Sequence, residues 1–231
     1  DNTIRLWDIT QLPAMSQLPD SNNSSKSSSI QQISNSLFED VPLTGNLTGD
    51  SLCIDTFRSK SNVNCVTYHP KFQDLFVSVG QNGVIELWDT NSSHQSALSW
   101  SGHNKIEVLS ADFDKYNSYQ LYTSGSDHYI YVWDIRHVKE PLLELGDHQL
   151  GVKRIQASPF KPGVLLSSGF DMNVFLWDIS TATPKKSSDS SSTSTTATSS
   201  PNNTTTSKQY IKGKYDAHTE FAFGLSWNLL I

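Results

Sequence analysis

The stretch YIYVWD (129–134) decides the fold, because three other segments of the chain end in the same way. Each segment leads into a terminal Trp-Asp pair through the period-two alternation of a half-buried β-strand. Trp88 and Trp133 are 45 residues apart, and Trp133 and Trp177 are 44 residues apart. Such a regular period indicates a repeat architecture. The other three segments are TIRLWD (3–8), VIELWD (84–89) and NVFLWD (173–178).

Two further strand-like segments precede each of the last three Trp-Asp pairs, and no segment shows helical periodicity. The pattern therefore predicts an all-β chain. Short strands at even spacing, with a period of about 40–45 residues, are typical of β-propeller blades. The preceding segments are LFVSVG (75–80), LYTSGS (121–126) and LLSSGF (165–170), and further upstream VNCVTY (63–68), VLSADF (108–113) and KRIQAS (153–158).

Two polar insertions interrupt this spacing. Trp7 and Trp88 are 81 residues apart, and the excess lies in residues 11–52, which are rich in Ser, Asn and Gln. Residues 181–209 contain 18 Ser or Thr among 29 residues. Neither insertion has enough apolar residues to offset its ordering entropy, so we predict that both are disordered. Both follow a Trp-Asp strand and should leave from one face of the propeller, which leaves the opposite face open for a ligand.

These observations define the expected organisation of the chain. A propeller needs several blades to bury its sheet faces and protect its strand edges, so we expect a fragment of a larger ring that does not close alone. The predicted parts are the end of a blade (1–10), an insertion (11–52), three blades (53–94, 95–138 and 139–180), a Ser/Thr-rich insertion (181–209) and the start of a further blade (210–231).

Composition narrows the function. The net charge of −6 and the pI of about 5.6 argue against a nucleic-acid surface, which requires a basic stripe. Cys53 and Cys65 lack metal-ligand spacing and favour a reducing compartment. No apolar run approaches the ~20 residues that span a bilayer. We expect no membrane insertion, no metal and no cofactor.

The sequence also gives no sign of catalysis. Four histidines are scattered without the spacing of a zinc site or of a general base. No Gly-rich phosphate loop or nucleophile elbow is present. We therefore predict that the protein is not an enzyme. The four histidines are His69, His94, His128 and His137.

The repeats resemble the WD40 family, in which a turn His, a strand Ser or Thr, a turn Asp and a strand Trp form a hydrogen-bonded tetrad that pairs each buried polar group. Segment 59–89 departs from this pattern, with Lys60 at the His position and Asn82 at the Asp position, so its tetrad should be weakened. His218 is the equivalent turn His of the last segment. The complete tetrads are His103, Thr123, Asp127, Trp133 and His148, Ser167, Asp171, Trp177.

A closer resemblance is to a peroxin family, the peroxisomal receptors for the type-2 targeting signal. It implies a seven-bladed WD40 propeller, of which this chain would run from the end of the third blade to the start of the seventh. It is carried by LSADFDKYN (109–117), WDIRHVKEPLLEL (133–145), VKRIQASPF (152–160) and AHTEFAFGLSW (217–227).

The resemblance also implies a function. The receptor is cytoplasmic and cycles to the peroxisomal matrix, and it delivers cargo proteins that carry the type-2 signal. It acts with a peroxin co-receptor and with docking proteins at the peroxisomal membrane. The signal is an N-terminal amphipathic helix of nine residues that begins with Arg and has a His or Gln near its other end.

Five residues are candidates for binding that signal. Glu107 and Glu220 follow turn histidines, and their carboxylates would receive the Arg of the signal. Phe170 and Phe221 would provide apolar contacts for its aliphatic stripe. Arg154, at a blade entry taken to match Glu107, would orient a rim carboxylate or contact the co-receptor. Alternatively, these residues do not bind the signal: the two carboxylates are solvated surface groups, and the two phenylalanines pack against a neighbouring blade.

Two other functions fit the repeats. The sequence Trp133-Asp134-Ile135-Arg136 matches a WDxR box, which in some WD40 proteins docks an adaptor of a cullin-type ubiquitin ligase. The simpler interpretation is that Arg136 lies in a strand connection and pairs with a nearby carboxylate. A generic scaffold, such as a histone-binding or signalling propeller, is the third hypothesis.

Overall fold

The computed structural model describes residues 2–7, 53–92, 95–182 and 207–228. The predicted insertion 11–52 and residues 183–206 of the second insertion lie outside the described residues, so the prediction of disorder is not addressed there. Every regular element among the described residues is a β-strand or a short 3-10 turn, which confirms the all-β prediction. The 3-10 turns are η5 (Gln81–Gly83), η6 (His103–Lys105) and η8 (Lys208–Tyr210).

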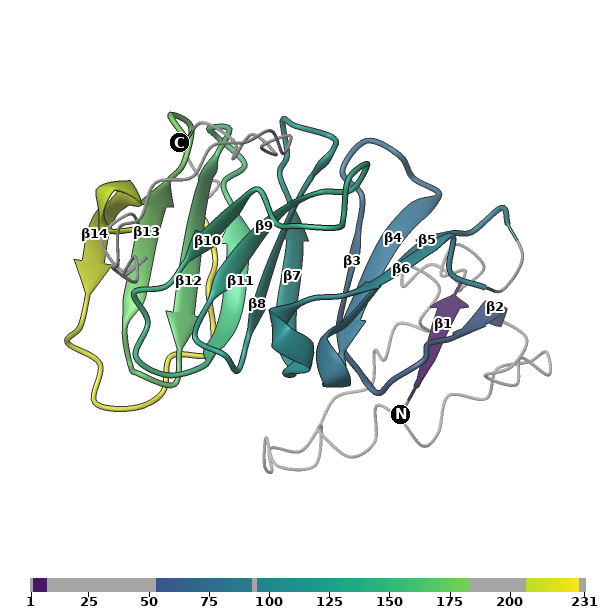
Figure 1. Ribbon diagram of the computed structural model, residues 1–231, viewed down its shortest axis with the longest axis horizontal. Coiled ribbons are helices and arrows are strands. Elements are labelled where there is room, and N and C mark those ends of the chain that lie inside the picture. Colours follow the sequence, from purple (N-terminus) through teal and green to yellow (C-terminus); the bar gives the residue numbers. More distant parts are fainter. Residues whose placement is uncertain (1, 8–52, 93–94, 183–206, 229–231) are drawn as a thin grey trace, which may run out of the picture. The chain divides into compact units, whose positions relative to one another are not determined.

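The described strands form one two-stranded and three four-stranded antiparallel sheets (Figure 1). The two-stranded sheet pairs β1 (Thr3–Trp7) with β2 (Cys53–Arg58), and nearly all of it belongs to a compact unit of residues 4–57. A second unit, residues 1–3 and 58–231, contains the other sheets.

Each four-stranded sheet is a simple meander, as the repeats predict. The first sheet contains β3 (Val63–Tyr68), β4 (Leu75–Gly80), β5 (Val84–Asp89) and β6 (Leu98–Ser101). The second contains β7 (Val108–Phe113), β8 (Gln120–Gly125), β9 (Ile130–Asp134) and β10 (Leu143–Leu145). The third contains β11 (Val152–Ala157), β12 (Val164–Gly169), β13 (Val174–Asp178) and β14 (Ile211–Tyr215).

The first strands of these three sheets, β3, β7 and β11, lie side by side (Figure 1). Hydrogen bonds join them across the sheets: the backbone N–H of Ala157 donates to Asp112 Oδ2 at 2.8 Å, and Asn64 Nδ2 donates to the carbonyl of Val108 at 2.8 Å. The apolar faces pack between neighbouring sheets, where Val77 and Ile85 contact the cluster of Phe113 and Leu121. This is the arrangement of consecutive propeller blades.

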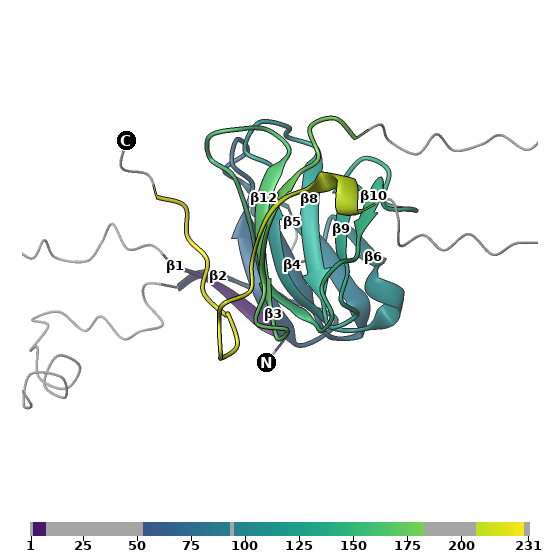
Figure 2. The same cartoon turned by 90° about the vertical axis from the view of Figure 1, so that its left-hand side faces the viewer.

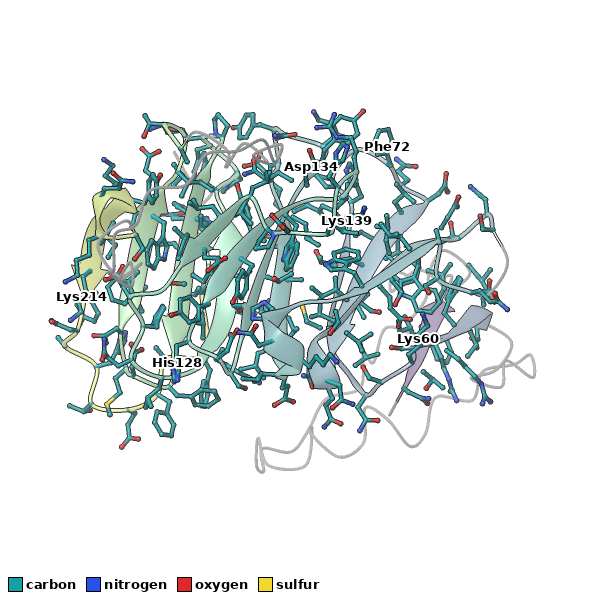
Figure 3. The ribbon with its side chains drawn as sticks, viewed as in Figure 1. Lys60, Phe72, His128, Asp134, Lys139 and Lys214 are labelled. Atoms are coloured by element: carbon teal, nitrogen blue, oxygen red, sulfur yellow. The ribbon has the colours of Figure 1, made fainter. Side chains whose placement is uncertain are left out.

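The strands run between two ends of the unit (Figure 2). Antiparallel order places the first-to-second and third-to-fourth connections at one end, which we call the insertion face because residues 183–206 fall in such a connection. The second-to-third turns and the fourth-to-first connections lie at the other end, the open face. Figure 3 shows His128, on the open face, opposite Phe72, Asp134 and Lys139, on the insertion face.

The sheets are offset by one strand from the predicted segment boundaries. Segment 95–138 begins with β6, which pairs with β5 of the preceding sheet, and residues 211–215 form β14, which pairs with β13. Residues 216–228 do not form a strand. They lie beside β11, where Trp227 Nε1 donates to the carbonyl of Gln156 at 3.4 Å. The fourth strand of each sheet therefore comes from the start of the next sequence repeat.

Candidate functional site

The second sheet contains a complete hydrogen-bonded tetrad. Trp133 Nε1 donates to Thr123 Oγ1 at 2.8 Å, and the same hydroxyl lies 2.8 Å from His103 Nε2. His103 Nδ1 lies 2.8 Å from Asp127 Oδ1. A carboxylate can only accept, so Nδ1 carries the imidazole proton and Nε2 accepts from Thr123. The tetrad fixes the turns that build the open face.

The third sheet repeats this arrangement with Ser167 in place of Thr. His148 Nε2 lies 2.7 Å from Ser167 Oγ, which accepts from Trp177 Nε1 at 2.8 Å. Burial lowers the pKa of His148, although the Asp171 carboxylate at 3.0 Å opposes that shift. For Asp171, burial alone would raise the pKa, but hydrogen bonds from Asn173, from the Gln149 N–H and from His148 lower it.

The first sheet has a different centre. Trp88 Nε1 still donates to Ser78 Oγ at 2.8 Å. Ser59, rather than the predicted Lys60, occupies the His position: it is buried and donates to Glu86 Oε2 at 2.6 Å, whereas Lys60 is exposed. Ser59 lies four residues before β3, as His148 lies four residues before β11, whereas Lys60 lies only three residues before β3. Asn82, at the predicted Asp position, is exposed in η5.

Glu86 is a buried carboxylate at a position that is aromatic in the other two sheets. It pairs across the strands with Ser78, as Tyr131 pairs with Thr123 and Phe175 with Ser167. A carboxylate therefore replaces the aromatic ring that packs edge-on against the tetrad His elsewhere. Glu86 is 1% exposed, and its Oε1 has no hydrogen-bond partner among the described residues. Such an unpaired buried atom costs about 1–3 kcal/mol.

Glu107 and Glu220, the two predicted rim carboxylates, both lie on the open face. Glu107 precedes β7 and is half-buried, and its Oε1 accepts from Asn64 Nδ2 at 3.0 Å. Glu220 is exposed and makes no hydrogen bond or ion pair with a described residue. One carboxylate is thus held by the neighbouring sheet and the other is free to rotate.

The two predicted phenylalanines come together with a third on the open face. The ring centroids of Phe170 and Phe221 are 5.6 Å apart, and Phe223 lies 5.5 Å from Phe170 and 5.8 Å from Phe221. We call these three residues the aromatic cluster. Phe221 and Phe223 are 52% and 50% exposed, which is unusual for side chains that contact one another. Sequence reasoning missed Phe223.

The predicted match between Arg154 and Glu107 is wrong. Val108 pairs with Gly125 and Val152 pairs with Gly169, so Gly151 stands at the position of Glu107. The same bulge follows Val108 and Val152, which aligns Arg154 with Ser110. Arg154 is exposed on β11 and makes no ion pair within the described part of the chain.

Arg136 of the WDxR sequence folds back onto its own strand. Its Nε and Nη2 donate to the two oxygens of Asp134 at 2.9 and 2.6 Å, and its guanidinium lies 4.1 Å from the ring centroid of Tyr119. The hydrogen bonds from Arg136 lower the pKa of Asp134. The expected pairing with a nearby carboxylate is confirmed, and the arginine remains exposed.

The scattered histidines take separate places. His69 is buried in a first-to-second connection, where its Nε2 donates to the carbonyl of Ser118 at 2.7 Å and its Nδ1 accepts from two backbone N–H groups. His128 and His137 are exposed, and His94 lies outside the described residues. His218 is exposed beside Tyr215. In the described ranges, no group of three or more His, Cys, Asp or Glu side chains is placed to hold a metal ion.

Four-stranded meanders with His–Ser/Thr–Asp–Trp tetrads define a β-propeller of the WD40 class. The model of the EIPR1 beta-propeller family matches residues 22–177, which is more than half of the chain, and the chain belongs to this family. The predicted WD40 fold is thereby confirmed. No helix among the described residues has the length and hydropathy of a membrane span.

Individual relatives carry different names. The chain is 29% identical over 195 residues to the peroxisomal targeting signal 2 receptor of Saccharomyces cerevisiae, covering 73% of this chain and 48% of the relative. The receptor of that name in Schizosaccharomyces pombe is 28% identical over 120 residues, covering 52% of this chain and 38% of the relative. Subunit 2 of the Candida glabrata type B histone acetyltransferase is 29% identical over 117 residues, covering 51% of this chain and 27% of the relative. The chain therefore spans about half the length of the first relative and less of the others.

Proposed function

We propose that the protein is a non-catalytic import receptor that binds the helical type-2 peroxisomal targeting signal of cargo proteins. The likeness to two receptors of that name supports the class of ligand. The aromatic cluster supports the site, because three partly exposed rings meet on the open face.

The spacing of the rings suits a helix. The three ring centroids lie 5.5–5.8 Å apart. Side chains at positions i and i+3 or i+4 of a helix are separated by about 5–6 Å, so the aliphatic stripe of an amphipathic helix can contact two rings at once. Burial of apolar atoms against such rings stabilises helix-in-groove complexes.

The carboxylates would orient the helix. Glu220 is free to rotate, and Glu107 keeps Oε2 without a hydrogen bond to any described residue while Asn64 holds Oε1. Either can accept charge-assisted hydrogen bonds from the leading Arg of the signal. Apolar contacts would thus supply affinity, and the charge would fix the direction in which the helix lies.

The proposal includes partners and location. A peroxin co-receptor would cover the exposed side of the bound helix, and docking proteins at the peroxisomal membrane would receive the complex. Arg154 remains a candidate for contacting the co-receptor, because it is exposed and unpaired within the described residues. The receptor would work in the cytoplasm and cycle to the peroxisomal matrix.

A fluorescence anisotropy titration tests this function. The full-length protein, alone and with a peroxin co-receptor, is titrated against a labelled type-2 signal peptide and against the same peptide with its leading Arg changed to Ala. We expect Phe223→Ser and Glu220→Gln each to weaken binding about tenfold. Phe72→Ser, which changes an aromatic residue that is 47% exposed on the insertion face, should leave binding unchanged. Equal binding of both peptides, or equal effects of the two Phe variants, would refute the proposal.

The ubiquitin-ligase adaptor is the second candidate, because Arg136 is exposed at the end of β9. Its ion pair with Asp134 would have to open on docking. Loss of adaptor co-purification in the Arg136→Ala variant, with signal-peptide binding absent throughout, would favour this candidate.

A further inference from the structure

A pocket lies on the insertion face, at the junction of the second and third sheets. Its volume is about 310 Å³, which is near the lower end of the range for small ligand sites. We call it the junction pocket. Its wall is apolar, formed by Val132, Leu142, Leu143 and Ile179, and two amide side chains, Asn117 and Gln120, lie at its edge.

The lining of the junction pocket suits an uncharged side chain of a peptide whose backbone lies against the two amides. None of the residues that line the pocket is charged. Asn117 Nδ2 reaches Gln120 Oε1 at 3.4 Å, which is a long hydrogen bond, and Gln120 Nε2 donates to no described residue. An apolar side chain can contact the apolar wall, while these amides can form hydrogen bonds with the backbone N–H and C=O groups of an extended segment.

Two exposed cations, one in each sheet, are neighbours of residues that line the junction pocket, although neither lines it itself. Gln120 pairs across β8 and β9 with Asp134, which holds Arg136, and Lys161 directly precedes the lining residue Pro162. The side chains of Arg136 and Lys161 are 55% and 58% exposed. Each pairs with an aspartate of its own sheet that is 15% exposed, and an ion pair at a surface of this kind contributes only about 0–1 kcal/mol.

We propose that the junction pocket binds an extended peptide segment of a partner protein, in which one apolar anchor residue is flanked on both sides by acidic residues. The anchor occupies the apolar wall, the amides bind the peptide backbone, and the acidic residues take over the guanidinium of Arg136 and the ammonium of Lys161. This site is at the opposite end of the strands from the aromatic cluster, so it is separate from the proposed signal site and does not depend on it.

Anisotropy titrations with three labelled synthetic peptides test the proposal on the full-length protein. The first peptide carries a central Leu between Asp-Glu pairs, the second replaces Leu with Ser, and the third replaces the acidic residues with Lys. Only the first should bind, and the other two should bind at least about tenfold more weakly. Absence of binding by the first peptide, or equal binding by the Ser peptide, would overturn the proposal.

Two changes in the protein locate the site. Ala182→Trp fills the pocket and should abolish binding, whereas Ser92→Trp, on the insertion face of the first sheet, should not. The double variant Arg136→Glu/Lys161→Glu should weaken binding at least about tenfold. Lys214→Glu reverses another exposed cation that pairs with an aspartate, here Asp216, and should change binding less than about twofold. Equal weakening by Lys214→Glu would show a general charge effect and overturn the site.

Discussion

Replacing Thr123 with Val tests whether the tetrad holds the second sheet together. The Thr123 hydroxyl is fully buried and joins two side chains: it accepts from Trp133 Nε1 and donates to His103 Nε2, both at 2.8 Å. Val has nearly the same shape but neither donates nor accepts. The variant therefore leaves one buried donor and one buried acceptor without partners.

The structure sets the size of the effect. An unpaired buried polar group costs about 1–3 kcal/mol, so Thr123→Val should lower the free energy of unfolding by about 2–6 kcal/mol. In the first sheet, Ser78→Ala removes only the hydrogen bond from Trp88, because no tetrad His is present. Its cost should be about 1–3 kcal/mol. Thr67→Val is the control for Thr123→Val: it removes a partly buried hydroxyl that forms no hydrogen bond with a described residue, and it should cost about 0.5 kcal/mol or less.

Equilibrium urea unfolding measures these differences. With a slope of about 2 kcal/mol per molar urea, a loss of about 3 kcal/mol lowers the unfolding midpoint by about 1.5 M. We expect the urea midpoint to be highest for Thr67→Val, lower for Ser78→Ala and lowest for Thr123→Val. If Thr123→Val costs no more than Ser78→Ala, the two-partner role of the Thr123 hydroxyl is refuted.

Four further predictions concern stability and docking. Gly125→Ala should destabilise by about 1–3 kcal/mol in urea unfolding, because an added Cβ would lie 2.6 Å from the tetrad imidazole, whereas Gly213→Ala, with 3.7 Å to its nearest neighbour, should be neutral within about 1 kcal/mol. Asp114→Asn should cost about 2–4 kcal/mol, because Oδ2 accepts from the Tyr122 hydroxyl at 2.6 Å and from the Gly163 N–H at 2.9 Å, Oδ1 accepts from the N–H groups of Tyr116 and Asn117 at 2.8 Å, and an amide can accept on one side only; a cost below 1 kcal/mol would show that one of these two pairs of bonds is not formed. Because burial lowers the pKa of His148 below its ordinary 6.5, its contribution to stability is present above about pH 6.5 and is lost as the pH falls, so the urea midpoint should drop between about pH 7.5 and 5.5 and drop less in His148→Gln. Arg136→Ala should leave the thermal midpoint unchanged, and a clear decrease would show that its exposed ion pair is structural.

The fold was predictable because its signal is repeated. The Trp-Asp spacing located β5, β9 and β13, and the alternating segments before them located the first and second strands of each sheet. The tetrads followed from residue types at regular spacing: the Ser or Thr and the Trp are ten residues apart in both, and the distance from the His to the Ser or Thr differs by one residue. Such local patterns are read directly from a sequence, because each is set by a few neighbouring residues.

Positions that depend on register were harder to assign. Ser59 and Lys60 are neighbours, and only the pairing of Val63 with Gly80 and the contact with Glu86 decide which of them takes the His position. Arg154 was misplaced because only the pairing of Val108 with Gly125 and of Val152 with Gly169 aligns the two first strands, and this pairing puts Gly151, three residues before Arg154, at the position of Glu107.

The aromatic cluster depends on tertiary structure. Phe170 lies in a turn after β12, whereas Phe221 and Phe223 lie in the segment that follows β14. The sequence pointed to Phe170 and Phe221 separately, as apolar contacts for a helix, but the mutual contact of the three rings arises from the path of residues 216–228 beside β11. Glu86 was overlooked because a carboxylate in an alternating strand usually faces solvent.

Site-specific photo-crosslinking shows whether the open face binds the targeting-signal helix. A benzophenone amino acid replaces Phe223 in one sample and Phe72, an exposed aromatic residue of the insertion face, in another. Each sample is irradiated with a labelled type-2 signal peptide. We expect a cross-linked product from position 223 and none from position 72. A product from position 72 alone, or from neither position, would contradict this expectation.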